Sequence, residues 1–328
     1  MTETQFTVAA HEEIMRLDQY LVRHTGLSRA AVVRLIEEGQ VRIDGRVGRK
    51  GAMVQPGQRV QLAQPASDPR GTPPVPQPEL ALSVLYQDAL IVVVNKLPGC
   101  ATHPLRPGER GTLASALVAR FPECAQASPE AREGGVCHRL DTYTSGAVIA
   151  ARSSAAWHAV RTLFREGQVE KTYLAVVCGE PAQDEFEVTQ PLLPAPGTDR
   201  HRRVIAAETP EQVYHPDALD AQTRFTVLRR GDGVALLRAH TATGRRHQVR
   251  AHLSCVGLPL LGDELYGAPP ASTLAAADLQ GYFLHADRVR LPKLDARAVP
   301  IAGGARLTVE APLPAQRQSL IERLFPRS

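Results

Sequence analysis

A single carboxylate stands out among the residues that could carry out a reaction. Asp141 lies in the segment HRLDTYTSG, residues 138–146, between an arginine and a turn rich in hydroxyl groups. The chain continues into AVIAA, 147–151, an apolar run that predicts a short buried strand. An aspartate beside such a strand is costly unless a cation pairs with it or a reaction uses it. Taken alone, the segment is more typical of a structural salt bridge than of catalysis.

Four other segments, far apart in the chain, carry polar residues of types that bind or catalyse. They are LIVVVNKLPGCATHP at 90–104, KTYLAVVCGE at 171–180, TGRRHQVRAHLSCVGLPLLGDELYG at 243–267 and FLHADRVRL at 283–291. The histidines around the third segment lack the i, i+4 spacing of an HExxH motif. The five cysteines never form a CxxC pair, which argues against a zinc ribbon or a disulfide framework. We therefore expect neither a metal nor another cofactor.

In order and spacing, the five segments resemble the RluA-type pseudouridine synthases over residues 82 to about 313. The resemblance implies that Asp141 is the catalytic carboxylate, that Tyr173 stacks on the target base and that Arg250 pairs with the aspartate. It also implies that Arg139 helps to open the RNA around a flipped nucleotide. We assign substrate or RNA binding to five further side chains of these segments, Lys96, His138, Thr144, His247 and Gln248.

The implied reaction fits these residue types. Uridine becomes its C5-glycoside when the N1–C1′ bond breaks, the uracil turns and the base is rejoined through C5. A carboxylate can attack C6 of the base or assist at the sugar, and the sequence leaves both routes open. The guanidinium of Arg250 suits a charged acid better than a lysine would, because it can bind in a bidentate fork. The ring of Tyr173 would hold the freed uracil once the nucleotide is extruded from structured RNA.

Two features depart from the family pattern. Lys96 is followed by Leu97 before Pro98, which lengthens by one residue a loop that usually reads NKP-x-G. The residues after the aspartate are Thr-Tyr where Lys/Arg-Asp is common, and Tyr143 is bulkier and uncharged. The sequence therefore does not decide whether the position of Tyr143 contacts an RNA phosphate or backbone.

The N-terminal part predicts two helices followed by a small hairpin. Ser28 is a good N-cap for the second helix, and Gly39 ends that helix. The dipeptide Asp44-Gly45 predicts a tight turn between two short strands. The segment RLDQYLVRHTGLSRAAVVRLIEEGQVRIDG resembles the S4 RNA-binding domain, which implies a grip on RNA phosphates with little reading of base sequence. The residues assigned to this grip are Arg16, Ser28, Arg29 and Arg42.

A proline-rich stretch divides the chain. Residues 64–80, QPASDPRGTPPVPQPEL, favour an extended backbone and predict a semi-rigid linker. We expect a small S4-like (αL-type) domain at 1–63 and a catalytic domain at 81–328. The larger part alternates short β-type runs with loops and a few helices. This pattern favours an α+β domain with a mostly antiparallel central sheet. The resemblance implies that this domain has the pseudouridine-synthase fold.

The composition is that of a soluble globular protein, with 43% hydrophobic residues and 22% charged ones. No apolar run is long enough to span a membrane. The first residues lack the basic and apolar regions of a signal peptide. We therefore expect a cytoplasmic protein without a membrane partner.

The net charge of +4 permits a polyanionic partner without demanding one. The fusion to an S4 domain resembles the branch of the family that acts on large-subunit ribosomal RNA. This resemblance implies 23S ribosomal RNA, or a large-subunit assembly intermediate, as the substrate, and we expect a monomeric pseudouridine synthase. Transfer RNA is the alternative substrate. A third interpretation is a non-catalytic RNA-binding or ribosome assembly factor on the same fold. The set Asp141, Tyr173 and Arg250 argues against that third interpretation, because a protein without activity has no need of a costly charge pair.

Overall fold

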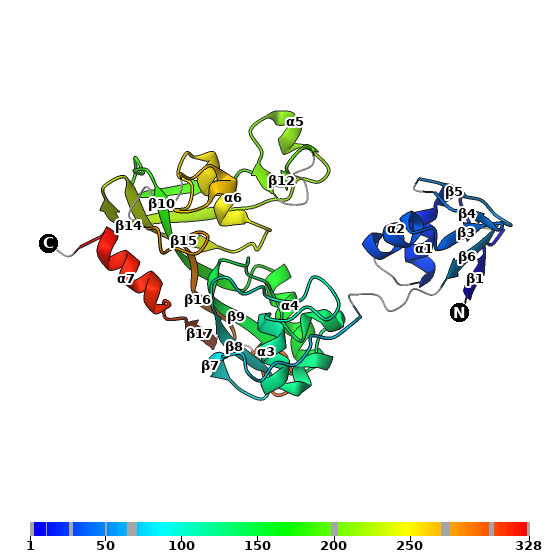
Figure 1. Ribbon diagram of the computed structural model, residues 1–328, viewed down its shortest axis with the longest axis horizontal. Helices are drawn as coiled ribbons and strands as arrows, with labels where there is room; N and C mark the ends of the chain where they lie inside the picture. Colours follow the sequence, from blue (N-terminus) through cyan, green and yellow to red (C-terminus); the bar gives the residue numbers. More distant parts are fainter. Residues whose placement is uncertain are drawn as a thin grey trace. The chain divides into compact units, whose positions relative to one another are not determined.

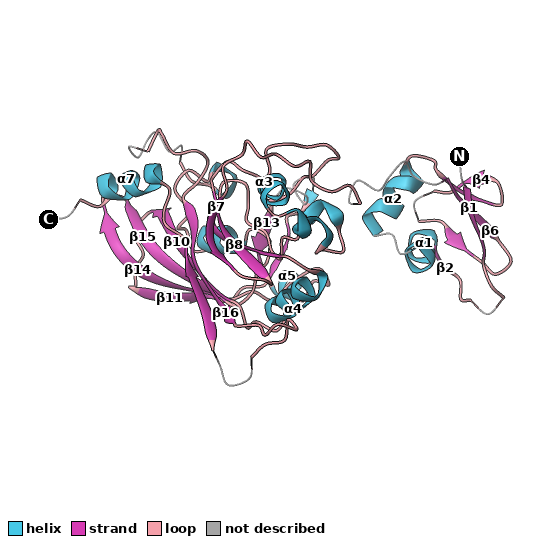
Figure 2. Ribbon diagram, turned by 90° about the horizontal axis from the view of Figure 1, so that it is seen from below, coloured by secondary structure: helices cyan, strands magenta, loops and turns pink. Residues whose placement is uncertain are grey.

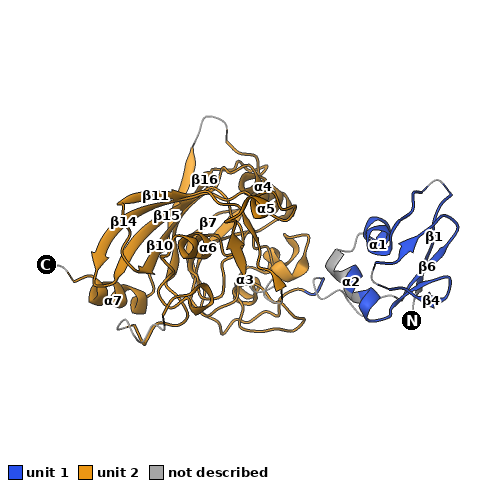
Figure 3. Cartoon of the chain, turned by 90° about the horizontal axis from the view of Figure 1, so that it is seen from above, with its two compact units in different colours: residues 1–72 blue, residues 73–328 orange. Residues whose placement is uncertain are grey.

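The computed structural model of the chain divides into two compact units, residues 1–72 and 73–328 (Figure 3). The structure describes residues 3–10, 12–25, 29–49, 51–63, 71–197, 203–269, 276–301 and 305–326. Within these ranges, the side chains of residues 3, 29–31, 34 and 63 are not described. In the described ranges, none of the helices has the length and apolar character needed to cross a membrane.

The small unit combines two helices with short strands. The helices are α1 (Leu17–Thr25) and α2 (Arg29–Glu37), and the described strands are β1 (Glu3–Thr7), β2 (Met15–Arg16), β3 (Val41–Ile43), β4 (Arg46–Val47), β5 (Met53–Val54) and β6 (Arg59–Ala63). Four strands form an antiparallel sheet in the order β1-β6-β3-β4 (Figure 1). The core of the unit lies between this sheet and the helices, where Leu21, Val32 and Val60 are fully buried.

The turns of the small unit follow the prediction made from the sequence. Asp44 and Gly45 have φ angles of 49° and 81°, as a two-residue type I′ turn between β3 and β4 requires. Gly39, with φ 71°, donates its N–H to the carbonyl of Ile36 just beyond the end of α2. The predicted helices and hairpin are thus confirmed, whereas the predicted N-cap Ser28 lies outside the described residues.

The large unit is built on one sheet (Figure 2). Its described strands are β7 (Ser83–Gln87), β8 (Ile91–Lys96), β9 (Ser145–Ala151), β10 (Glu170–Cys178), β11 (Glu185–Val188), β14 (Thr223–Gly231), β15 (Val234–Thr241), β16 (Leu284–Pro292) and β17 (Arg306–Glu310). The order is β11-β14-β15-β10-β16-β9-β8-β7, with β17 paired to β16. Among these pairings only that of β16 with β9 is parallel. The predicted α+β fold with a mostly antiparallel sheet is confirmed.

Helices cover both faces of this sheet. The helical segments are α3 (Leu113–Arg120), η1 (Pro122–Gln126), η2 (Ala131–Glu133), α4 (Ser154–Arg165), α5 (Pro210–Val213), α6 (Gln248–Cys255), η4 (Glu264–Tyr266) and α7 (Ala315–Leu324), beside a small hairpin of β12 (Leu192–Pro194) and β13 (Val204–Ala206). Successive side chains of a strand point to opposite faces. In β15, Leu237 therefore packs with Leu253 of α6, whereas Leu236 lies on the other face and packs with α7.

The two halves of the sheet meet where β9 and β16 run parallel. Ser145 pairs with His285 and Gly146 with Ala286. Gly146 has φ 116°, and a Cβ at this position would collide with the backbone of Ala286. Only glycine therefore allows the two strands to approach so closely. The HRLDTYTSG segment thus enters the sheet at the junction of its halves.

The boundary between the units falls earlier than the prolines suggested. Residues 73–80, predicted as linker, belong to the large unit. The backbone N–H of Gln77 donates to the carbonyl of Ser115, and its side-chain oxygen accepts from the N–H of Gly111. Proline favours an extended backbone, but it does not prevent such a segment from packing along a surface.

Candidate active site

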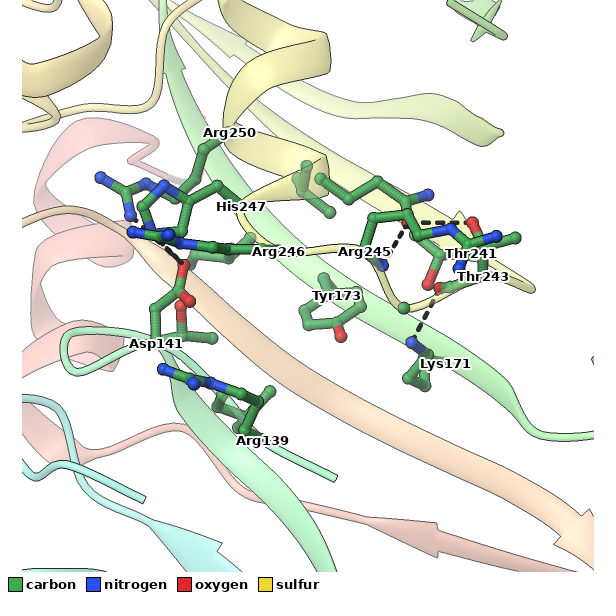
Figure 4. A pocket seen from close by; sticks show the side chains of 16 residues that line it. Arg139, Asp141, Lys171, Tyr173, Thr241, Thr243, Arg245, Arg246, His247 and Arg250 are labelled. Carbon is green, nitrogen blue, oxygen red and sulfur yellow. Dashed lines mark hydrogen bonds and ion pairs between the residues drawn. The ribbon is translucent and has the colours of Figure 1, made fainter. Parts of the chain in front are cut away.

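A cavity of about 140 Å³ lies at the junction of the two halves of the sheet (Figure 4). It is lined by the loop before β9, by β10 and β15, and by the loop that leads into α6. Its polar lining residues are Arg139, Asp141, Thr144, Lys171, Tyr173, Thr241, Thr243, Arg245, Arg246, His247, Gln248 and Arg250. Together with Leu284, they bring four of the five segments singled out in the sequence into one pocket.

The loop that carries Asp141 is held by a buried lysine. Lys96, at the end of β8, has no exposed surface. Its ammonium donates hydrogen bonds of 3.0, 2.7 and 2.9 Å to the backbone oxygens of Leu97, Cys100 and Thr142. Burial lowers the pKa of Lys96 to about 8. The assignment of Lys96 to RNA binding is therefore wrong, since its three N–H donors bind the protein's own backbone beside Asp141.

One guanidinium joins two carboxylates. Arg250, on α6, binds Asp263 in a bidentate fork, with Nε–Oδ2 at 2.7 Å and Nη2–Oδ1 at 2.9 Å. Its third nitrogen, Nη1, lies 3.3 Å from Oδ2 of Asp141. The contact expected between Arg250 and Asp141 is present, but the stronger bidentate contact goes to Asp263. The sequence alone assigns no role to Asp263, because nothing in the spacing shows which carboxylate binds Arg250 in the bidentate mode.

Two tyrosine rings enclose the guanidinium of Arg250. Its central carbon lies 4.2 Å from the ring centre of Tyr282 and 4.8 Å from that of Tyr266. The Tyr282 hydroxyl donates a hydrogen bond of 3.3 Å to Oδ2 of Asp141. Burial, and next the charge of Asp141, raise the pKa of Tyr282, so this hydroxyl remains a donor. Nothing in the sequence singles out Tyr282, since a lone tyrosine before a strand is by default a core residue.

His247 lies beside Asp141 as a neutral neighbour. Its Nδ1 is 3.0 Å from the hydroxyl of Tyr266, which itself donates to the carbonyl of Val204, so we assign the imidazole proton to Nδ1. The unprotonated Nε2 then faces Oδ2 of Asp141 at 3.7 Å, beyond hydrogen-bond range. Burial lowers the pKa of His247 to about 4, although the charge of Asp141 acts in the opposite direction.

All contacts to the side chain of Asp141 reach the same oxygen. Arg250, Tyr282 and His247 approach Oδ2, and no residue in the described ranges forms a hydrogen bond with Oδ1. The side chain is 19% exposed and faces the cavity. The site therefore holds one oxygen of the carboxylate and leaves the other without a hydrogen-bond partner among the described residues (Figure 4).

Three more assigned residues reach the cavity. Tyr173, on β10, lies between Asp141 and Lys171 (Figure 4), and burial raises the pKa of its hydroxyl. Arg139 is exposed at the cavity and forms no hydrogen bond or ion pair with any residue that the structure describes. Thr144 is buried and lines the same cavity. All three residues thus line the cavity, and the roles assigned to them from the sequence stay predictions.

Two residues assigned to RNA binding instead hold neighbouring segments of the protein. The Nε2 atom of His138 accepts a hydrogen bond of 3.0 Å from the N–H of Ile149, and burial lowers the pKa of His138 to about 3. The amide of Gln248 donates to the carbonyl of Gln222 at 2.9 Å and accepts from the N–H of Arg245 at 3.1 Å. His138 does not line the cavity, and its assignment to substrate or RNA binding is corrected accordingly, whereas Gln248 lines the cavity and its assignment stays a prediction.

A second buried guanidinium lies behind the site. Arg317, on α7, donates to the backbone oxygens of Tyr143, Tyr282 and Leu284 and to the hydroxyl of Ser145. None of the carboxylates in the described ranges forms a salt bridge with it. Burial lowers the pKa of Arg317 to about 10. Arg317 thus ties the turn after Asp141 to the strand that follows Tyr282, and nothing in the sequence indicates this role.

No metal site emerges from the histidine-rich segment. Within the described ranges, no group of three or more His, Cys, Asp or Glu side chains is arranged to hold a metal ion. His240 and His252 each have Nδ1 within hydrogen-bond distance of a threonine hydroxyl, that of Thr172 at 3.3 Å and that of Thr223 at 2.9 Å.

The residues assigned in the small unit differ in their surroundings. Arg16 forms an ion pair of 2.8 Å with the buried carboxylate of Asp18 and stays partly exposed. Arg42 is exposed on the hairpin, where it donates to a backbone oxygen of the turn. The side chain of Arg29 is not described, and Ser28 lies outside the described residues.

Comparisons with known proteins place this geometry in a family. Residues 90–255 match the model of a family described as RNA pseudouridylate synthase, and residues 15–60 match that of the S4 domain. An uncharacterized RNA pseudouridine synthase of Chloroflexus aurantiacus is 36% identical, covering 95% of this chain and 91% of its own length. Ribosomal large subunit pseudouridine synthase D of Pasteurella multocida is 29% identical, covering 98% and 95%.

Among solved structures, the human protein named RNA Pseudouridylate Synthase Domain Containing 4 superimposes with a TM-score of 0.55 at 25% identity. The superposition covers 74% of this chain and 92% of the human chain. Sequence motifs, family models and fold therefore agree. The chain belongs to the RNA pseudouridine synthase family of isomerases and carries an N-terminal S4 domain.

Proposed function

We propose that this protein isomerises specific uridines of large-subunit ribosomal RNA, with Asp141 as the catalytic carboxylate. The observation that carries the proposal is the asymmetry of the Asp141 side chain. Oδ2 is held by Arg250 and Tyr282, while Oδ1 has no hydrogen-bond partner among the described residues and the side chain lines the cavity. A carboxylate fixed through one oxygen is oriented and stabilised in its charged form. Its second oxygen is then available to attack the flipped nucleotide.

Tyr173 and Arg139 fit supporting roles in this reaction. The ring of Tyr173, adjacent to Asp141 in the cavity, provides an aromatic face for the uracil while it is detached and turns. The exposure of Arg139 at the cavity supports a contact with the RNA from which the nucleotide has been extruded. Extrusion costs a few kcal/mol, which contacts with RNA phosphates offset.

The choice of ribosomal RNA rests on two observations. The S4 domain is a module that grips structured RNA, and one relative bears the name ribosomal large subunit pseudouridine synthase D. We propose 23S rRNA, free or in assembly intermediates, as the substrate of a monomeric cytoplasmic enzyme. Transfer RNA remains the alternative substrate, and a non-catalytic RNA-binding factor the alternative function.

The role of Asp141 is tested by the substitution Asp141→Asn. The amide keeps the size of the side chain but cannot act as a charged nucleophile, so pseudouridine formation should be abolished. RNA affinity should stay within a few-fold of wild type. The exposed Asp232→Asn, in the turn between β14 and β15, serves as the matched control with unchanged activity. Product formed by Asp141→Asn would contradict the assignment, and an inactive wild type would favour the non-catalytic factor.

The substrate is tested by mapping pseudouridines in RNA from cells with and without this protein. We expect sites missing from 23S rRNA and an unchanged set in transfer RNA. Purified wild-type protein, with Asp141→Asn as the blank, should then restore those sites on rRNA. Sites missing only from transfer RNA would overturn the substrate assignment while leaving the enzyme assignment intact.

The small unit is tested through the salt dependence of RNA binding. Arg42 and Arg46 are exposed on the hairpin of β3 and β4. If each contacts a phosphate, each alanine substitution should reduce the slope of log K against log salt by about 1, because one fewer phosphate is neutralised. Arg323→Ala, on α7 in the large unit, is the matched control. Unchanged slopes for both hairpin variants would exclude this face of the small unit as the RNA contact.

A further inference from the structure

Lys171 is a buried cation for which the reaction proposed above has no role yet. It lies on β10, two residues before Tyr173, with 6% of its surface exposed. Its ammonium donates one hydrogen bond of 2.8 Å to the carbonyl of Thr243 and lies 5.8 Å from the ring centre of Phe164. Within the described ranges it forms no salt bridge. Burial, and next the charge of Arg245, lower its pKa to about 8.

A buried hydroxyl without a partner lies directly across from this lysine. Thr241, on β15, pairs with Lys171 in the antiparallel ladder, so the two side chains share one face of the sheet. The Oγ1 atom of Thr241 is inaccessible to solvent and has no hydrogen-bond partner among the described residues, although Thr241 lines the cavity. Most buried side-chain polar atoms in proteins are hydrogen-bonded. An unbonded one at a cavity wall therefore points to a group that arrives from outside.

A glycine keeps space around the ammonium. A Cβ placed on Gly244 would lie 2.9 Å from Nζ of Lys171. Figure 4 shows Lys171, Thr241 and Thr243 gathered at one end of the cavity, with Asp141 at the other end and Tyr173 between them. The glycine, the unbonded hydroxyl and the ammonium thus form one polar end wall.

We propose that Lys171 and Thr241 form a second subsite, which binds an oxygen of the flipped nucleotide opposite Asp141. This inference rests on the proposed function. An ammonium with unused N–H donors and no carboxylate partner gains most from an oxygen that bears negative charge. Two groups of the nucleotide offer such an oxygen, a flanking phosphate and a carbonyl of the uracil, which becomes anionic when the N1–C1′ bond breaks. In both cases the contact forms only when the nucleotide has entered the cavity.

The subsite is tested with Lys171→Met and Thr241→Val, which remove the charge and the hydroxyl with little change in volume. We expect kcat/KM on the target RNA to fall on the order of tenfold or more for Lys171→Met, and a few-fold for Thr241→Val. Lys293→Met, at an exposed position, and Thr226→Val, on the opposite face of the sheet, are the matched controls. Melting curves establish that each variant is folded.

The source of the oxygen is distinguished by RNA substrates with a neutral methylphosphonate at one position next to the target. If a phosphate binds Lys171, one such substrate should lower the wild-type rate to that of Lys171→Met and leave the variant unchanged. If every substituted RNA keeps the difference between wild type and variant, the uracil carbonyl is the ligand. Retention of wild-type kcat/KM by folded Lys171→Met and Thr241→Val would overturn the subsite.

Failure of the subsite and failure of the proposed function give different results. RNA binding of the Lys171 and Thr241 variants is measured in the Asp141→Asn background. Product formation is measured in the protein that retains Asp141. Absence of product from wild type, with RNA binding weakened by Lys171→Met, would end the proposed function and leave the subsite standing. Product formation that is unaffected by both substitutions would end the subsite and leave the proposed function standing.

Discussion

The two ends of the cavity treat their buried cations differently. At one end, Arg250 is compensated by Asp141 and Asp263 and enclosed by tyrosine rings. At the other end, Lys171 has a carbonyl oxygen and a ring as neighbours, but no carboxylate among the described residues. A compensated cation is held in place before any ligand binds, whereas an uncompensated one gains its strongest contact from the ligand. The comparison indicates that the protein itself organises the Asp141 end and that the substrate completes the Lys171 end.

The bidentate contact of Asp263 explains how the first end is organised. It takes two nitrogens of Arg250 and so fixes the direction of the third, which meets Asp141. Asp263 is 2% exposed, while Asp141 is 19% exposed at the same guanidinium. One carboxylate is therefore structural and the other accessible, although both contact the same cation.

Among the predictions, we expect the largest effect from Asp263→Asn, which removes a carboxylate that compensates Arg250. The substitution leaves Arg250 with a single charged partner and removes the constraint on its direction, so we expect kcat to fall on the order of a hundredfold. Removing one partner of a buried pair should also destabilise the fold by about 3–5 kcal/mol. Single-turnover kinetics and chemical denaturation measure the two effects. Asp278→Asn, at an exposed salt bridge, is the control. A folded Asp263→Asn variant with wild-type kcat would show that the fork does not orient the site.

A smaller effect is expected from Arg317→Lys. The lysine keeps the charge but cannot reach all four acceptors around the turn after Asp141 and around Tyr282. We expect kcat to fall about tenfold with KM nearly unchanged, because this residue positions the site without touching RNA. Arg323→Lys, on the exposed side of the same helix, should leave both constants unchanged. A rise in KM alone would contradict a positioning role.

The smallest expected effect is a dependence of kcat/KM on pH, which distinguishes the Lys171 end of the cavity from the Asp141 end. At the Asp141 end, His247 is neutral, with its pKa lowered to about 4. At the other end, Lys171 has its pKa lowered to about 8, so its ammonium is lost as the pH rises through that value. We expect kcat/KM to fall several-fold between about pH 8 and pH 9 in wild type. Lys171→Arg keeps its charge and should lack the part of this decline that the loss of the Lys171 ammonium causes.

Lys96 provides the internal check on that profile. Its pKa is also lowered to about 8 by burial, but it is the same in wild type and in the Lys171→Arg variant. The difference between the two profiles therefore reports on Lys171 alone. Identical alkaline declines in both proteins would assign the titration elsewhere and remove the predicted contrast.

Much of the fold could be predicted because its signals are local. The turn at Asp44-Gly45 needs only a pair of residues that tolerate positive φ, and this turn is present. The short buried strand predicted at 147–151 is found within β9, and its run of apolar residues reflects burial on both faces. The predicted linker ended at residue 80, whereas the large unit begins at residue 73. Proline content indicates which backbone conformation a segment prefers, but not whether the segment packs on a domain, as that of Gln77 does.

By itself, the sequence determined which side-chain chemistries this protein brings together. The motif around Asp141, the strand of Tyr173 and the helix of Arg250 are recognisable as segments, and all three meet in one cavity. Only the tertiary structure decided the partners. It turned Lys96, His138 and Gln248 inward to backbone groups, since satisfying buried polar atoms depends on neighbours distant in the chain. It also gave the fork of Arg250 to Asp263 and left Lys171 uncompensated, because the direction of a side chain is set by packing and not by spacing.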